Sequence, residues 1–545
     1  MKKLIPIIAL IALMLSSCEG WLDINTDPNN PSEIKLNKVL PGINQDIGDV
    51  LGNSYMRLGY ITSVYVHQLT SRESIDEYGI NGNDLDANWS DLYTGPVKEL
   101  ESLIAQAEDT DNMIYAGIGK IYKAFIYSQM VDIWGDVPFS EVAIPGNYNP
   151  VFDKDVDIYT QLLALLDEAI ADIENTESAN EIKPGADDII FKGNTASWLN
   201  TARSLKLKLY VQVMNTSLYN QSAVDALVAG SLIAKGADFS IPYGTSQAPD
   251  NRNPGFVDEY AGGQISSYIS PWFYEVLKGE AAHILNGNAD PRLPYYICTQ
   301  LGATEDPENP TEYQNDRFVS IYFGSQGVYR DGAGRNTFAM IGLYPVGGAF
   351  DSPDLNKASG LGVDAGTGAA PLRLLTHADV LFLQAELIAK GKISGDLKAT
   401  LESAMLAAFA QVDAVATVAK KAGATVPALT GSDAVTAYIT KALAEFDAAN
   451  DDQKFEMVMT QKWISKFGSA IDAYTDYRRT GYPVMFDPNT MAAIANGGPD
   501  GNGPVPVQST RPYVVSFPWS SDELSLNTSA PAQKSPATAK IFWDN

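Results

Sequence analysis

The chain has 545 residues, with 66 acidic against 38 basic side chains and a formal net charge of −28 at pH 7. This charge argues against a nucleic-acid partner, because proteins bind phosphate backbones through Lys and Arg side chains that release counterions. Apolar residues make up 45% of the chain and aromatic residues 10%, which excludes overall disorder.

The first 17 residues have the pattern of a secretory leader. A short basic start precedes an apolar run from Leu4 to Leu15, which is shorter than the ~20 residues that a membrane-spanning helix needs. The following Leu15–Cys18 resembles a bacterial lipobox, in which the cysteine becomes the first mature residue and carries the lipid. We expect a lipoprotein signal peptide over 1–17, lipidation at Cys18 and a mature body over 18–545; a plain secreted protein is the alternative.

Three helices are predicted in the first half of the mature chain. Apolar side chains recur at spacings of three and four in segments that begin near Ile114, Ile158 and Asn194. This spacing places them on one face of a helix, and Asn194 is a favourable residue for capping the third. Such apolar faces are typical of packing in a protein core.

The pattern changes between about residues 241 and 350. Gly, Pro, Asn and Asp interrupt short mixed runs here, which predicts loops and short strands. Fifteen Phe, Trp and Tyr residues lie between Phe256 and Tyr344, a higher density than in the chain as a whole. Because binding surfaces are usually carried by loops, this loop-rich insertion is the expected ligand-binding region.

Helical spacing returns in the last third of the chain. It predicts helices that begin near Val380, Leu397 and Val435, followed by one long helix from Phe455 to Tyr474. Helices in successive pairs suggest a tetratricopeptide-like scaffold, although no clean 34-residue repeat is present. The predicted fold is mainly α, with tetratricopeptide-like helix pairs that support a loop-rich region with a few short strands.

Common catalytic motifs are absent from the sequence. It contains no G-x-S-x-G, H-E-x-x-H, C-x-x-C or complete phosphate-loop motif. His67, His283 and His377 are far apart and lack the spacing of zinc ligands. We therefore expect no catalytic residues, no metal site and no cofactor. A surface glycosidase stays open as an alternative, because any two of the many carboxylates could meet in a cleft.

Several motifs, in chain order behind the lipobox, carry a resemblance to a known family. Trp134–Glu141 is similar to a Y-G-D-V-P-Y-S-E turn, with Trp134 in place of the tyrosine, and Leu374–Glu386 is similar to an R-x-A-E-V-L-L-x-x-A-E helix. Further matching segments include Trp21–Asn29, Ala202–Leu207 and Tyr477–Pro483, as well as Arg511 and Phe517–Pro518 near the end of the chain. Together they resemble the SusD/RagB family of surface lipoproteins of Bacteroidetes-type bacteria.

This resemblance implies a nutrient-binding function. Family members are anchored in the outer membrane by their lipid, face the cell exterior and pack on a SusC-like TonB-dependent transporter. They capture an oligosaccharide, or in some branches a peptide, and act as a lid on the transporter without catalysis. The sequence does not distinguish a glycan from a peptide as the nutrient.

Exposed aromatic residues in loops are the candidates for ligand contacts. Sugar faces stack on aromatic rings, and sugar hydroxyls need directed hydrogen bonds. Each candidate has a second interpretation as a core residue, and Trp89 could equally start a helix and be buried. The predicted ligand-binding residues are Tyr78, Trp89, Tyr322, Tyr329, Arg330, Phe338 and Tyr344.

Overall fold

The computed structural model describes residues 35–485 and 511–544, apart from residues 72, 263–264, 266, 303–304, 308–310, 325–336 and 353–365. The predicted signal peptide, Cys18, Tyr329 and Arg330 lie outside this part of the chain.

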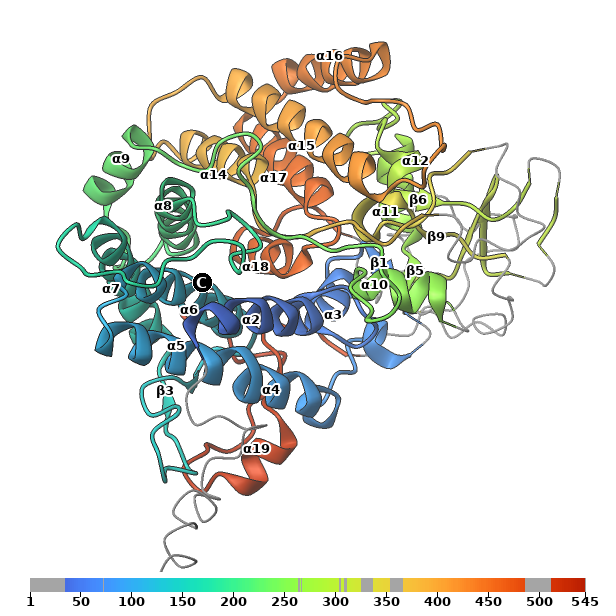
Figure 1. Cartoon of the computed structure of the whole chain (residues 1–545). Helices are drawn as coiled ribbons and strands as arrows, with labels where there is room; N and C mark the ends of the chain where they lie inside the picture. The colour runs from blue at the N-terminus through green and yellow to red at the C-terminus, as the bar shows by residue number, and fades with distance from the viewer. Residues whose placement is uncertain are drawn as a thin grey trace, which may run out of the picture.

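The described chain is mainly helical, as predicted (Figure 1). Its α-helices are α2 (Leu36–Leu51), α3 (Leu58–Tyr65), α4 (Asp86–Leu92), α5 (Lys98–Asp109), α6 (Met113–Trp134), α7 (Asp155–Glu174), α8 (Thr195–Gln212), α9 (Gln221–Ala229), α10 (Pro254–Phe256), α11 (Pro271–Lys278), α12 (Leu293–Tyr296), α13 (Leu343–Val346), α14 (His377–Ala389), α15 (Leu397–Ala419), α16 (Asp433–Ala448), α17 (Asp451–Ser465), α18 (Ala470–Thr480) and α19 (Ser521–Leu526).

The strands of the described chain are short and pair in twos. They form the antiparallel pairs β1–β5, β2–β3, β4–β10, β6–β9 and β7–β8. Their bounds are β1 (Leu69–Thr70), β2 (Val137–Pro138), β3 (Phe152–Asp153), β4 (Phe239–Ile241), β5 (Tyr268–Ile269), β6 (Ile297–Cys298), β7 (Tyr313–Asn315), β8 (Phe318–Ser320), β9 (Met340–Ile341) and β10 (Leu372–Leu375). The prediction of a few short strands is thus confirmed.

The helices predicted in the first half are α6, α7 and α8. Asn194 caps α8, because its side chain accepts a hydrogen bond from the backbone N–H of Ser197 at 3.2 Å. Consecutive helices pack on one another, with α6 against α7 and α14 against α15. These contacts make the predicted helix pairs.

The long helix predicted from Phe455 to Tyr474 is in fact two helices, α17 and α18. The chain turns between them at Gly468, which has a φ of 88°. A Cβ atom at this position would lie 2.3 Å from the Cβ of Pro345, so only glycine fits. Apolar residues continue through the turn, and spacing alone therefore hid the break.

Helix α15 is long and apolar enough to cross a membrane by length and composition. It packs against α14 and α16, however, and buries Leu401, Met405 and Phe409. Burial of this kind is expected of a core helix.

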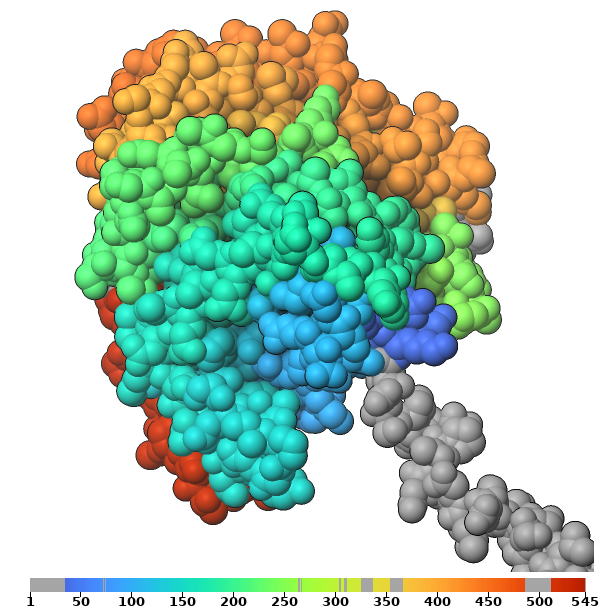
Figure 2. Space-filling model, turned by 60° about the vertical axis from the view of Figure 1, so that its left-hand side comes forward, coloured from blue at the N-terminus to red at the C-terminus, as the bar shows by residue number. Residues whose placement is uncertain are grey.

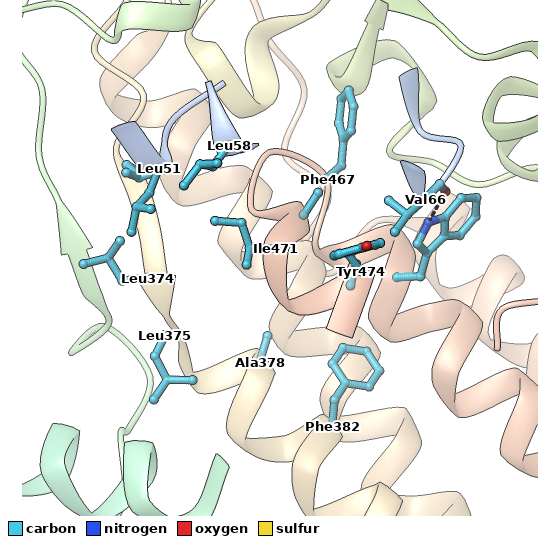
Figure 3. Close-up of a cluster of buried hydrophobic side chains, with 14 of the residues drawn as sticks. Leu51, Leu58, Val66, Leu374, Leu375, Ala378, Phe382, Phe467, Ile471 and Tyr474 are labelled. Carbon is cyan, nitrogen blue, oxygen red and sulfur yellow. Dashed lines mark hydrogen bonds between the residues drawn. The ribbon is translucent and has the colours of Figure 1, made fainter. Parts of the chain in front are cut away.

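The core joins elements that are far apart in the sequence. In the close-up of Figure 3, side chains from α3, β10, α14 and α18 gather around Ile471. Leu58, Leu374, Ala378 and Tyr474 are among them. Their mutual burial fixes the strand β10 against the helical scaffold.

Figure 1 shows the arrangement of these parts. The helices α14–α17 lie above α2–α7, and most of the short strands lie to one side. In Figure 2 the segment coloured teal to green covers the face between the orange and the blue helices. This segment contains α8 and α9 and leads into β4.

Candidate functional site

The predicted aromatic residues of the described chain are buried. Tyr78 is 6% exposed, Trp89 and Tyr322 are 4% exposed, and Phe338 and Tyr344 are 1% exposed. The expectation of exposure is therefore wrong for Tyr78, Tyr322, Phe338 and Tyr344, whereas Trp89 follows its alternative interpretation as a buried residue. Their large apolar areas pack against neighbouring elements, although glycine and polar residues surround several of them in the sequence.

Tyr78 belongs to an aromatic cluster formed by Tyr65, His67, Tyr78, Phe323 and Tyr513. The hydroxyl of Tyr78 lies 2.9 Å from Nε2 of His67. The centroid of the Tyr78 ring lies 5.2–5.7 Å from those of Tyr65, Phe323 and Tyr513. Burial lowers the pKa of His67 to about 3, so the imidazole is neutral at physiological pH.

Trp89 lies in α4, as its second interpretation predicted. Its Nε1 donates to Oε2 of Glu523 at 3.3 Å, and its ring meets that of Trp134 edge to face at 5.3 Å. Trp134 in turn donates from Nε1 to the carbonyl of Pro518 at 3.1 Å. Both tryptophans therefore hold the C-terminal segment against the first half of the chain.

Tyr322 and Phe338 pack on different neighbours. The ring of Tyr322 meets that of Tyr313 edge to face at 5.4 Å, and the ring of Phe338 meets that of Tyr268 in the same way at 4.6 Å. Each ring packs against an aromatic residue of a short strand, β7 or β5. The predicted residues thus do not converge on one described surface.

Tyr344 contacts two residues that line a cavity, and this cavity was not predicted from the sequence. Its ring stacks on Tyr296 at 4.7 Å and lies 4.1 Å below the guanidinium of Arg373. Its hydroxyl accepts a hydrogen bond from Nε2 of Gln411 at 2.9 Å. Arg373 and Gln411 both line the cavity.

The cavity has a volume of about 360 Å³, within the range of small-molecule sites. Its wall comes from residues just before α8, from β4 and β10 and from one face of α15. Apolar side chains dominate it, among them Ile189, Ile190, Pro371, Val415 and Val418. The polar lining residues are Asp238, Ser240, Tyr243, Arg373 and Gln411.

Strand pairing positions two of the polar residues. Arg373 of β10 is directly opposite Ser240 of β4, and residues opposite each other in an antiparallel pair share a face. The neighbours of Ser240, Phe239 and Ile241, are buried in the core. The alternation of the strand therefore directs Ser240 to the side opposite the core.

Asp238 carries the negative charge of the cavity wall. Its Oδ1 accepts a hydrogen bond from the backbone N–H of His377 at 2.7 Å, at the start of α14. Burial raises the pKa of Asp238, while this hydrogen bond and the charge of Arg373 act in the opposite direction.

One signal in the sequence could have marked Arg373. It interrupts the apolar run Leu372–Leu375 directly before the helix cap Thr376, and a charge in a buried strand needs a specific partner. Asp238 and Gln411 carry no comparable signal, because only the fold brings them to the same cavity.

The histidines of the described chain have separate environments. His283 stacks on Trp272 at 5.4 Å, and Nδ1 of His377 lies 3.0 Å from the carbonyl of Ile233. Within the described residues, no group of three or more His, Cys, Asp or Glu side chains could hold a metal ion.

Comparisons with known proteins assign the chain to a family. A family model of SusD-like proteins, described as starch-binding and associating with the outer membrane, matches residues 28–500. No curated protein matches the chain.

Solved structures share the fold at low identity. A structure described as a chitin-binding protein has a TM-score of 0.67 and 18% identity, and the match covers 94% of this chain and 100% of that one. A SusD/RagB family protein from Bacteroides thetaiotaomicron has a TM-score of 0.67 and 15% identity, and the match covers 94% of this chain and 99% of that one. A SusD homologue from Bacteroides uniformis has a TM-score of 0.63 and 18% identity, and the match covers 93% of this chain and 99% of that one. Since the family model spans well over half of the sequence, the chain belongs to the SusD-like family of outer-membrane nutrient-binding proteins.

Proposed function

We propose that the protein is a surface lipoprotein that binds an oligosaccharide outside the cell and delivers it to a TonB-dependent outer-membrane transporter. It acts as a lid on the transporter and does not cleave its ligand. The observation that carries this proposal is the match of the starch-binding, outer-membrane family model over residues 28–500.

Two further observations favour a glycan as the nutrient. The family model is described as starch-binding, and one protein of the same fold is described as chitin-binding. Both are polysaccharides, whereas neither description mentions a peptide. The proposed anchor is the lipid on Cys18, which precedes the folded body.

Tyr329 and Arg330 are the proposed ligand contacts among the residues predicted from the sequence. Tyr78, Trp89, Tyr322, Phe338 and Tyr344 are buried, so a ligand would reach them only after a rearrangement of their surroundings. Tyr329 can supply a stacking ring and Arg330 hydrogen-bond donors, the two contacts that a sugar requires.

Calorimetry of the mature protein with maltoheptaose, chitohexaose and a matched peptide mixture tests the ligand class. We expect heat of binding with a glycan and no new reducing ends after prolonged incubation. Release of shorter sugars would instead identify a surface glycosidase, and binding of peptides alone would identify a peptide receptor.

Gentle crosslinking in membranes tests the partner and the anchor. We expect the protein to be recovered with a barrel transporter, and a Cys18→Ala variant to leave the membrane fraction. Recovery of the intact protein alone after crosslinking would contradict the proposed lid.

A further inference from the structure

Arg373 differs from the other buried cations of the described chain. Seven Lys and Arg residues there are buried, and six of them form ion pairs with carboxylates. Arg373 has no such pair. Its Nη2 donates to the carbonyl of Phe467 at 2.7 Å, and its Nη1 has no hydrogen-bond partner. A buried charge without an ionic partner is costly, so an anion that reached Arg373 would gain a strong interaction.

Asp238 supplies the opposite charge on the wall of the same cavity. Arg373 acts on it electrostatically, but the two side chains do not form an ion pair within the described structure. The cavity wall therefore carries one cation and one carboxylate that leave each other unpaired. A simple anion would be attracted by Arg373 and repelled by Asp238, whereas a zwitterion would satisfy both.

The rest of the wall sets the shape and polarity of the ligand. Aliphatic groups of the wall come from Ile189 and from Val415 and Val418 of α15. Val418 is 54% exposed, so the apolar strip continues from the cavity to the molecular surface. A compact ligand with an aliphatic side chain fits this surface better than a sugar ring, which would leave its hydroxyls against hydrocarbon.

We propose that the cavity binds a free aliphatic amino acid. Its carboxylate pairs with the guanidinium of Arg373, its ammonium group faces Asp238, and its side chain packs on Val415 and Val418. This proposal does not depend on the glycan-binding function.

Three small molecules test whether binding requires both charged groups of the ligand. Leucine carries both charged groups, leucinamide lacks the carboxylate, and 4-methylpentanoate lacks the ammonium group. In calorimetric titrations of the mature protein we expect leucine to bind at least about tenfold more tightly than either analogue, since each analogue loses one charge-assisted interaction with the cavity wall. Equal binding of the three, or no binding of leucine, would overturn the proposal.

Two variants and a control test the location. Asp238→Asn keeps an oxygen for the N–H of His377 but removes the charge, and Val418→Glu places a carboxylate at the exposed rim. Both should weaken leucine binding at least about tenfold. The control is Leu406→Glu, which adds the same charge to α15 at a residue that is 43% exposed and outside the cavity lining.

Melting curves confirm that each variant is folded before the titration is interpreted. Glycan binding should be the same in the wild type and in Val418→Glu, which separates this site from the proposed nutrient site. Unchanged leucine binding in Val418→Glu, or the same loss in Leu406→Glu, would place the amino acid elsewhere.

Discussion

His67 lies in a buried environment that makes its protonation unfavourable. It is buried beside Phe323, with ring centroids 4.0 Å apart, and its Nε2 lies within hydrogen-bond distance of the hydroxyl of Tyr78. Burial lowers its pKa to about 3, whereas a histidine in an unfolded chain has a pKa of about 6.5. Between these two values the unfolded chain binds more protons than the folded chain.

We therefore predict that His67 makes the protein less stable as the pH falls through 6.5. The linkage relation gives a loss of about 2 kcal/mol in the free energy of unfolding between pH 7 and pH 5. The variant His67→Gln can still hydrogen bond to Tyr78 but cannot take up a proton in this range. Urea unfolding at several pH values should show a smaller loss of stability for this variant than for the wild type.

Asp132, whose pKa is also shifted, does not affect the comparison between the wild type and His67→Gln. Burial raises the pKa of Asp132 to about 6, so its contribution to stability decreases as the pH rises between about 4 and 6. This contribution has the opposite sign to that of His67 but is common to both proteins. Parallel stability curves for wild type and variant would show that His67 is protonated in the folded protein as easily as in the unfolded chain.

The aromatic residues show what sequence could and could not predict about the site. Residue type and glycine neighbours predict that Tyr322 and Phe338 are exposed, but both are buried. Phe338 packs on Tyr268 of the distant strand β5, and Tyr322 packs on Tyr313 of the neighbouring strand β7. The alternative prediction that Trp89 lies in a helix is confirmed. Helix formation depends on residues nearby in the sequence, so a local pattern can predict it. Exposure depends on tertiary contacts, and a local pattern contains no information on them.

At the scale of elements, most helices could be predicted from local patterns. Apolar spacing and caps such as Asn194 depend only on neighbouring residues, and the structure confirms α6, α7, α8 and α14–α16 where these patterns occur. The division of α17 from α18 depends on Gly468 and its contact with Pro345, which is distant in sequence. The cavity has the same origin, because β4 and β10 pair across more than a hundred residues.

Buried ion pairs connect the helices of the last third to one another. Nζ of Lys466, at the end of α17, lies 2.9 Å from carboxylate oxygens of Asp379 in α14 and Asp472 in α18. Burial alone would lower the pKa of Lys466, but the two carboxylates hold it above its usual value. The lysine is thus charged and fully paired, and it joins three helices.

We predict that Lys466→Met lowers the free energy of unfolding by about 3–5 kcal/mol, because it leaves the buried carboxylate of Asp379 without its cation and Asp472 with Lys208 alone. Chemical denaturation of the purified variant measures this loss. Lys398→Met is the matched control, since Lys398 pairs with Asp447 at 2.6 Å on the surface. That exposed pair should contribute less than about 1 kcal/mol. Equal losses in the two variants would mean that the buried pairs do not hold these helices together.

At the scale of the whole molecule, the C-terminal segment returns to the first half of the chain. The backbone N–H of Phe517 donates to the carbonyl of Ile133 at 2.8 Å, at the end of α6. Further along, Nε1 of Trp543 donates to Oδ1 of Asp132 at 3.1 Å. In Figure 1 the helix α19 of this segment lies beside the lower helices, far from α14–α17. The chain therefore closes on the helices that precede the loop-rich region.

This closure is predicted to contribute a large part of the stability. Val514, Phe517, Trp519, Ile541 and Trp543 are buried, and each such side chain contributes about 1.5–3 kcal/mol when it is removed from water. Their sum is comparable to the total stability of a typical domain, about 5–15 kcal/mol. A chain that ends before residue 511 should therefore yield no cooperatively folded protein.

A single substitution tests the same closure in a protein that still folds. Trp543→Ala should lower the free energy of unfolding by about 3–5 kcal/mol, because it removes a fully buried ring and leaves a cavity beside Asp132. Leu526→Ala is the control in the same segment, since Leu526 is 78% exposed and loses almost no buried area. Urea unfolding compares the two. If Trp543→Ala were as stable as Leu526→Ala, the C-terminal segment would lie on the first half of the chain without stabilising it, and the ring of Trp543 would not belong to the core that α6 and α7 form.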